Sequence, residues 1–304
     1  MSQATDEATH GRRLAATARC LLHVDAEAAL PRALLAEAEA LAHAHALSFT
    51  ELEWGRALLL RWDGDLAGAR AALERALTLA GAQGERWREL ECLICLAQVE
   101  LERGCFDRVT ACCDEIEAVA QRLGEADAPI AAALRALARM AAHEPGATAA
   151  FTAALERLRT VDSKAHLAYA LNWAAEIQRE QGSRAEALSC AREALRAAQA
   201  VDRRTEILVA CALLAGFGPA ATADAHASAG PDDLAPVAAQ WQRLAGAVSD
   251  PGQLSARARD HLGDHLGDHP RAHQAGRNGG RAGLEGSKPR AAPPGPTPLP
   301  SHQP

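Results

Sequence analysis

The sequence predicts an all-α fold built as an array of antiparallel helix pairs, and two observations support this prediction. Hydrophobic residues make up 48% of the 304-residue chain but aromatic residues only 3%, so that most of the apolar content is Ala, Leu and Val. Ala and Leu are strong helix formers. In addition, a Gly-x-apolar-x-x-small pattern recurs along the chain at a nearly constant spacing, which is typical of helical repeats.

Five copies of this pattern are in register. The clearest is Gly64–Ala69, and Gly104–Val109 follows 40 residues later. Gly182–Ala187 begins 78 residues after Gly104, which leaves room for one more copy, and His143–Gly146 fills that place. One period before Gly64 lies Val24, where a helical stretch begins without a glycine. We therefore expect five units, each with a turn between antiparallel helices where glycine adopts conformations closed to other residues.

The segments after these turns have the periodicity of helices. Small and apolar residues recur there at helical spacing, as at Ala69, Leu73 and Ala76. Small side chains at such positions allow neighbouring helices to approach closely. Ser48–Glu51 and Ser183–Glu186 have the form of a capping box, in which a hydroxyl and a carboxylate satisfy free amides at a helix start. We expect both boxes to be formed.

Ala57, Gly64, Ala69 and Ala76 match, position by position, the pattern of the tetratricopeptide repeat. That pattern places a small residue in the first helix, a glycine at the turn and two alanines in the second helix. The period of about 40 is longer than the family's usual ~34 residues, and is more similar to the long-repeat, maltose-regulator-like arrays of bacterial signalling and transcriptional-regulator ATPases. The resemblance covers roughly Leu14 to Ala215. It implies a right-handed α-solenoid with an extended concave surface for a protein or peptide partner.

The resemblance also implies which residues line the concave groove, by counting the family's positions from the turn glycines. The candidate partner-binding residues are Glu51, Trp54, Leu58, Arg61, Trp62, Glu91, Ile94, Gln98, Leu101, Glu102, Tyr169, Asn172, Glu176, Arg179 and Glu180. Trp54, Trp62 and Tyr169 stand out, because exposed aromatics of this type are typical interface anchors. Packing between repeats is the alternative role for them. Acidic residues outnumber basic ones in the set, which favours a basic or apolar peptide.

The chain divides into four expected parts. Residues 1–10 are expected to be a disordered N-terminus, and residues 11–215 the repeat array. Within the next part, 216–248, Leu234–Val248 has the pattern of a helix that could cap the array. Nine of the fifteen prolines lie from Pro251 onward, so we expect residues 249–304 to be a disordered tail; an out-of-frame extension is the alternative.

Charge and hydropathy exclude several classes of function. The net charge of −7 argues against a sequence-independent nucleic-acid binder, because neutralising phosphates requires a clustered excess of Lys and Arg. The segment Ile207–Ala221 is the best membrane candidate, but it is shorter than the roughly 20 residues needed to span; its first part, Thr205–Ala215, is expected to be a buried helix. No secretory signal precedes the array. We expect a cytoplasmic protein that binds neither nucleic acid nor membrane.

Two groups of residues suggest metal chemistry. The tail histidines His261, His265, His269 and His273 recur every four residues, a spacing that would align imidazoles on a helix. Gly263, Gly267 and Pro270 disfavour that helix, and a short tandem duplication explains the pattern.

The eight cysteines include Cys92, Cys95, Cys105 and the Cys112–Cys113 pair in one repeat. Their spacing is not that of a zinc ribbon, so packing as small hydrophobes is the favoured interpretation. We therefore expect no metal site and no cofactor.

No phosphate-binding loop, nucleophile elbow or His-Glu-x-x-His helix occurs in the sequence. We therefore expect a non-catalytic protein-protein interaction scaffold or sensor module rather than an enzyme. One alternative is a detached tetratricopeptide-like portion of a bacterial signal-transduction ATPase or transcriptional regulator. Another is a metal-binding protein that uses the tail histidines.

Overall fold

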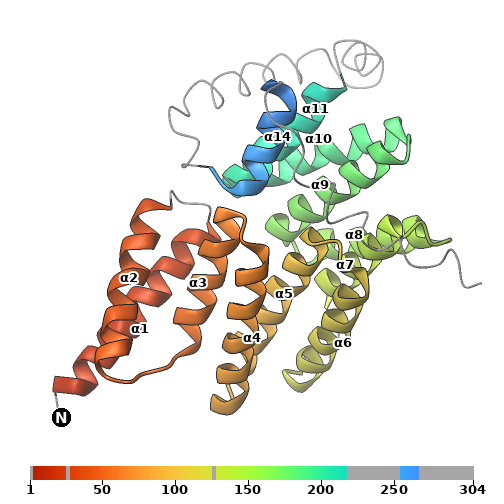
Figure 1. Cartoon of the computed structure of the whole chain (residues 1–304). Coiled ribbons are helices and arrows are strands. Elements are labelled where there is room, and N and C mark those ends of the chain that lie inside the picture. Colours follow the sequence, from red (N-terminus) through yellow and green to blue (C-terminus); the bar gives the residue numbers. More distant parts are fainter. Residues whose placement is uncertain (1–2, 25–27, 125–127, 218–253, 267–304) are drawn as a thin grey trace, which may run out of the picture. The chain divides into compact units, whose positions relative to one another are not determined.

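The chain is seen in a computed structural model that describes residues 3–24, 28–124, 128–217 and 254–266, with side chains for all of these except 3–5 and 262–266. The described residues form twelve helices and no strand (Figure 1). The helices are α1 (Gln3–His23), α2 (Ala29–Ala44), α3 (Thr50–Asp63), α4 (Leu66–Gln83), α5 (Arg86–Glu102), α6 (Phe106–Arg122), α7 (Pro129–Ala141), α8 (Ala147–Thr160), α9 (Lys164–Glu180), α10 (Arg184–Ala200), α11 (Arg204–Gly216) and α14 (Ala256–Leu266).

Consecutive helices pack in pairs, as the repeat predicted. The pairs are α1–α2, α3–α4, α5–α6, α7–α8 and α9–α10, and each also contacts the next pair. The turns inside the last four pairs lie at the predicted glycines, and Gly64 and Gly104 have φ angles of 93° and 72°. A residue with a Cβ is strained in that left-handed region. The predicted all-helical fold and its pairing are therefore confirmed.

The turns between pairs follow a different rule from the turns within them. Gly84 and Gly124 have positive φ angles there, but Ala46, Asp162 and Asp202 adopt the same region without being glycine. Aspartate tolerates this conformation better than most residues. These turns carry no repeated glycine, which explains why the sequence pattern located only the turns inside the pairs.

Small residues fill the contacts within and between the pairs. Ala69, Ala76, Ala187 and Ala191 are fully buried, as the periodicity predicted. One continuous apolar cluster runs from Ala15 to residues of α11. Buried alanines therefore allow the helices to pack closely along all five pairs and against α11.

The predicted capping boxes are not formed. Phe49 precedes α3 and Ser183 precedes α10, but neither provides a side-chain hydrogen bond to the helix start. At α4, by contrast, the carboxylate of Asp65 accepts a hydrogen bond of 2.8 Å from the backbone N–H of Gly68. The capping-box prediction was wrong because that motif fixes the residue types and not the rotamers that close it.

The ends of the array differ from the sequence prediction in two places. Helix α1 begins at Gln3, so most of the expected disordered segment 1–10 is helical. Helix α14 lies inside the tail 249–304 that was expected to be disordered, and it continues through Gly263. The predicted helix at 205–215 is confirmed as α11. The predicted helix Leu234–Val248 falls outside the described residues. None of the helices described is long and apolar enough to cross a membrane.

Burial of the repeat cysteines has a consequence that can be measured. Cys92, Cys95 and Cys113 are buried, and burial raises the pKa of the Cys95 thiol to about 11 and that of Cys113 to about 12. Cys20 is exposed. Because the thiolate is the reactive species, we expect a thiol reagent at pH 8 to label Cys20 in the native protein orders of magnitude faster than these three. Mass spectrometry of quenched samples measures the difference, and equal labelling in the native state would contradict packing as their role.

Candidate functional site

The first helix of each pair lines one face of the array. Helices α3, α5, α7, α9 and α11 contact one another in sequence. We call this surface the inner face and define it by ten side chains of α3, α5, α9 and α11, which are Trp54, Arg61, Glu91, Gln98, Glu102, Tyr169, Asn172, Trp173, Glu176 and Glu206. Residues from well-separated repeats meet here.

Arg61 of α3 is the centre of the first polar cluster on this face. Its Nε lies 3.1 Å from both carboxylate oxygens of Glu102, and its Nη1 donates to Gln98 at 2.9 Å. The guanidinium also lies 5.6 Å from the ring centroid of Tyr169, which comes from α9. Burial opposes the charged form, but Glu102 outweighs it and raises the pKa of Arg61 above its usual value. This cluster ties α3, α5 and α9 together.

Arg257 of α14 is the centre of the second cluster. Its guanidinium lies 3.0 Å from the carboxylate of Glu176 on α9 and 3.4 Å from that of Glu206 on α11. It also lies 4.9 Å from the ring of Trp173 and 5.1 Å from the ring of Tyr169. A planar, delocalised cation suits a site that combines two carboxylates with two aromatic faces.

The two acidic partners of Arg257 are themselves buried and held in place. Glu176 is 8% exposed and Glu206 is 4% exposed. The amide of Asn172 donates to Glu206 at 2.7 Å, and the His261 ring lies 3.2 Å from Glu176. Burial acts to raise the pKa of Glu176, but Arg257 and His261 outweigh burial and lower it to about 2. Glu176 is thus held as a carboxylate by side chains that α14 supplies, chiefly the guanidinium of Arg257.

Helix α14 also reaches the turn between α3 and α4. Arg259 donates to the backbone carbonyl of Asp63 at 3.3 Å. A Cβ placed on Gly64 would lie 3.0 Å from the Cβ of Ala256. The segment therefore touches α3 as well as α9 and α11, although its sequence lies outside the repeats.

Replacing two turn glycines by alanine separates backbone strain from contact with α14. Gly64 and Gly84 both have positive φ, and only Gly64 has another atom within 4 Å of an added Cβ. We expect either substitution to lower the free energy of unfolding by about 1 kcal/mol through strain. Only Gly64→Ala should also speed amide hydrogen exchange in α14, as measured by mass spectrometry. Equal exchange in the two variants would mean that α14 does not rest on this turn.

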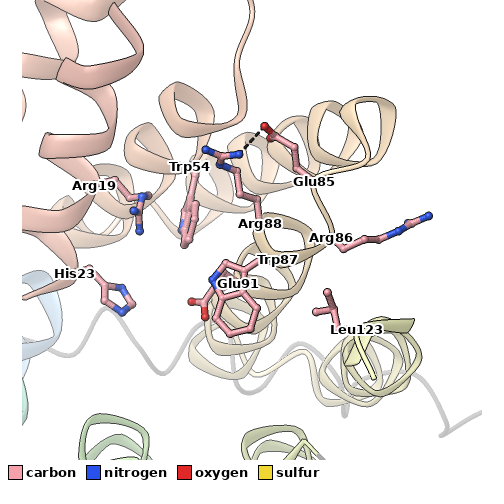
Figure 2. A pocket seen from close by; sticks show the side chains of 9 residues that line it. All are labelled: Arg19, His23, Trp54, Glu85, Arg86, Trp87, Arg88, Glu91 and Leu123. Carbon is pink, nitrogen blue, oxygen red and sulfur yellow. Dashed lines mark hydrogen bonds and ion pairs between the residues drawn. The ribbon is translucent and has the colours of Figure 1, made fainter. Parts of the chain in front are cut away.

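A cleft of about 760 Å³ opens between α1, α3 and α5 (Figure 2). Its lining residues are Arg19, His23, Trp54, Glu85, Arg86, Trp87, Arg88, Glu91 and Leu123. Trp87 is 58% exposed, whereas Trp54 is buried beneath Arg19, whose guanidinium lies 4.3 Å from its ring. Burial raises the pKa of Glu91. The cleft therefore combines an exposed indole with charges of both signs.

Two histidines near the cleft make stability depend on pH. Burial, with help from Arg203, lowers the pKa of both His23 and His166 to about 4. The unfolded chain binds these protons near pH 6.5, so their contribution to stability is complete above 6.5 and is lost as pH falls toward 4. We expect the urea midpoint to fall over that range. A His23→Gln/His166→Gln variant should show a flatter dependence, whereas His43→Gln, at an exposed position, should follow the wild type; identical curves for all three would contradict this account.

The structure places most of the predicted binding residues inside the protein. Those that are buried are Glu51, Trp54, Leu58, Trp62, Ile94, Gln98, Leu101, Tyr169, Asn172 and Glu176. Arg61, Glu91 and Glu102 are partly buried, and Arg179 and Glu180 are exposed. Of the two roles considered for Trp54, Trp62 and Tyr169, their burial favours packing between repeats over that of exposed anchors. Partner binding by the set remains a prediction.

Sequence reasoning missed several residues of the inner face and the cleft. Trp173, Glu206 and Arg257 complete the second cluster, and Trp87 is the exposed aromatic of the cleft. Trp87 had a usable signal, because it begins a helix just after a glycine turn in a chain with few aromatics. Arg257 had no such signal, since its surroundings have the composition of a tail.

The histidine series does not converge on a metal site within the described residues. The His261 ring faces Glu176, and no group of three or more His, Cys, Asp or Glu side chains with suitable geometry occurs among the residues whose placement is known. The side chains of His265, His269 and His273 lie outside that part of the chain. A metal role for them stays untested.

No protein-family model matches the sequence, and no curated protein matches it.

Proposed function

We propose that this protein is a non-catalytic scaffold that binds a partner protein or peptide on the inner face of a right-handed, tetratricopeptide-like solenoid. The observation that supports it best is the cleft beside that face, where Trp87 is 58% exposed next to the partly buried Glu91. Large aromatic side chains that remain exposed beside a concave surface are typical interface anchors. The same proposal covers a freestanding scaffold and the sensor part of a signalling ATPase or transcriptional regulator.

The lining of the cleft indicates what kind of segment it accepts. Arg88 pairs with Glu85 and Glu51, so its charge is already neutralised within the protein. Glu91 lies one helical turn from Trp87 in the lining of the cleft (Figure 2), and Arg19 is the cation that acts on its carboxylate. A segment that places an apolar side chain against Trp87 and a hydrogen-bond donor near Glu91 would satisfy both groups. A few residues of an extended peptide, or one or two turns of a helix, supply such a pair of groups.

Site-specific photo-crosslinking tests the proposal. A photo-reactive amino acid in place of Trp87 should give a discrete cross-linked species in the cells that make the protein. The same amino acid in place of Glu186, an exposed residue of α10, serves as the matched control and should give none. Cross-links at the control but not in the cleft, or at neither position, would remove the support for binding at this face.

A further inference from the structure

We propose that α14 is an intramolecular ligand of the inner face, and that the partner presents an arginine on a helix to the same acidic and aromatic site. This inference rests on the proposed scaffold function and specifies the partner's chemistry. Its starting point is that Glu176 and Glu206 belong to the array, whereas the cation between them comes from a segment outside the repeats.

The acidic pair requires a cation when it is covered. Glu176 and Glu206 are buried and contact the same guanidinium. Buried carboxylates are poorly solvated, so covering them without a positive charge is strongly unfavourable. Asn172 holds the carboxylate of Glu206 at 2.7 Å, which fixes one acceptor before any ligand arrives. The array therefore carries a preformed anionic site.

The aromatic walls select arginine over lysine. The guanidinium carbon of Arg257 lies 4.9 Å from the ring centroid of Trp173 and 5.1 Å from that of Tyr169, within the range of cation–π contacts. Both rings are buried. Arginine stacks its planar group on such faces while donating to two carboxylates, which the compact, strongly hydrated ammonium of lysine does less well.

The other contacts of α14 are of a kind that allows a partner segment to replace this helix. Among the described side chains of this segment, Leu254 and Ala258 are the buried apolar ones. Its other attachments are polar, including Ser255 with Thr205 at 2.9 Å and Arg259 with the carbonyl of Asp63. Residues 218–253 connect the segment covalently to the end of α11, so a partner must compete with an occupant at high effective concentration. Among the side chains described, the apolar contact is thus limited to two residues, which favours a ligand that can leave.

A labelled peptide in fluorescence anisotropy tests this inference on the full-length chain. The probe is a synthetic peptide of residues 254–266. We expect it to bind the Arg257→Gln chain at least about tenfold more tightly than the wild type, whose site is filled by its tethered segment. Ala258→Glu, which removes α14 by steric and charge conflict at a 1% exposed position, should have the same effect. Arg179→Gln, at an exposed arginine of α9, is the matched control and should behave as the wild type.

Variants of the peptide test whether the site recognises arginine specifically. A peptide with Arg257→Gln should lose binding to the Ala258→Glu chain, and one with Arg257→Lys should bind it more weakly than the parent peptide. Peptide binding that is equal in wild-type and Ala258→Glu chains, or absent from both, would overturn the inference and leave α14 as a fixed structural helix. In that event specific cross-linking at Trp87 would still support the scaffold function. Loss of that cross-linking with peptide binding retained would instead remove the scaffold function and leave only a self-binding site.

Discussion

Replacing Arg61 with methionine is expected to lower the free energy of unfolding by about 3 kcal/mol, because breaking a buried ion pair leaves an uncompensated charge. Arg61 and Glu102 have side chains 21% and 10% exposed, and they join α3 to α5. For an array of this size the loss corresponds to a fall in melting temperature of roughly 6–12 °C. Thermal unfolding followed by circular dichroism measures it.

A paired substitution shows whether the effect comes from the charge. In Arg61→Met/Glu102→Met both partners are apolar, so most of the lost stability should return. Arg32→Met is the control, because Arg32 on α2 and Asp63 on α3 form a more exposed pair, with side chains 53% and 38% exposed. A loss at Arg61 no larger than the ~0.5 kcal/mol typical of an exposed pair would show that this cluster does not hold the repeats together.

The second large effect is expected at Phe151, which is 2% exposed on α8. Phe151→Ala should lower the free energy of unfolding by about 3–5 kcal/mol, because it removes a large ring and leaves a cavity. Trp87→Ala removes a larger side chain from the surface and should change it by no more than about 0.5 kcal/mol.

Urea unfolding of the two variants provides this comparison. A small effect of Phe151→Ala would mean that the α7–α8 pair unfolds separately from its neighbours, as repeat arrays with weak interfaces do. A large effect of Trp87→Ala would mean that the indole is part of the core and not available to a partner.

The helix pairs could be predicted because each depends on local sequence. A glycine at a turn such as Gly104, followed by small residues at helical spacing, determines both the conformation of the turn and the face that packs. The exposure of individual residues could not be predicted in this way. Trp54 and Trp62 lie on the helix positions that the family pattern assigns to the groove, but neighbouring helices cover both rings.

The site around Arg257 could not be predicted from the sequence, for a different reason. Arg257 and Glu176 are 81 residues apart, and no repeat pattern connects them. The composition around α14, with its glycines and nearby prolines, predicted disorder, because local propensity does not include the contacts that a buried ion pair supplies to a short helix. The acidic character of the groove residues favoured a basic or apolar peptide, and that partner chemistry stays a prediction.

Hydrogen exchange of α14 tests the central claim, that the inner face holds this helix through one arginine, most directly. In full-length wild type, the amides of residues 256–266 should be protected. In Arg257→Gln they should exchange near the rate of an unstructured peptide, while those of α9 and α11 remain protected. Protection of α14 that is unchanged in Arg257→Gln, or loss of protection across the whole array, would contradict the claim.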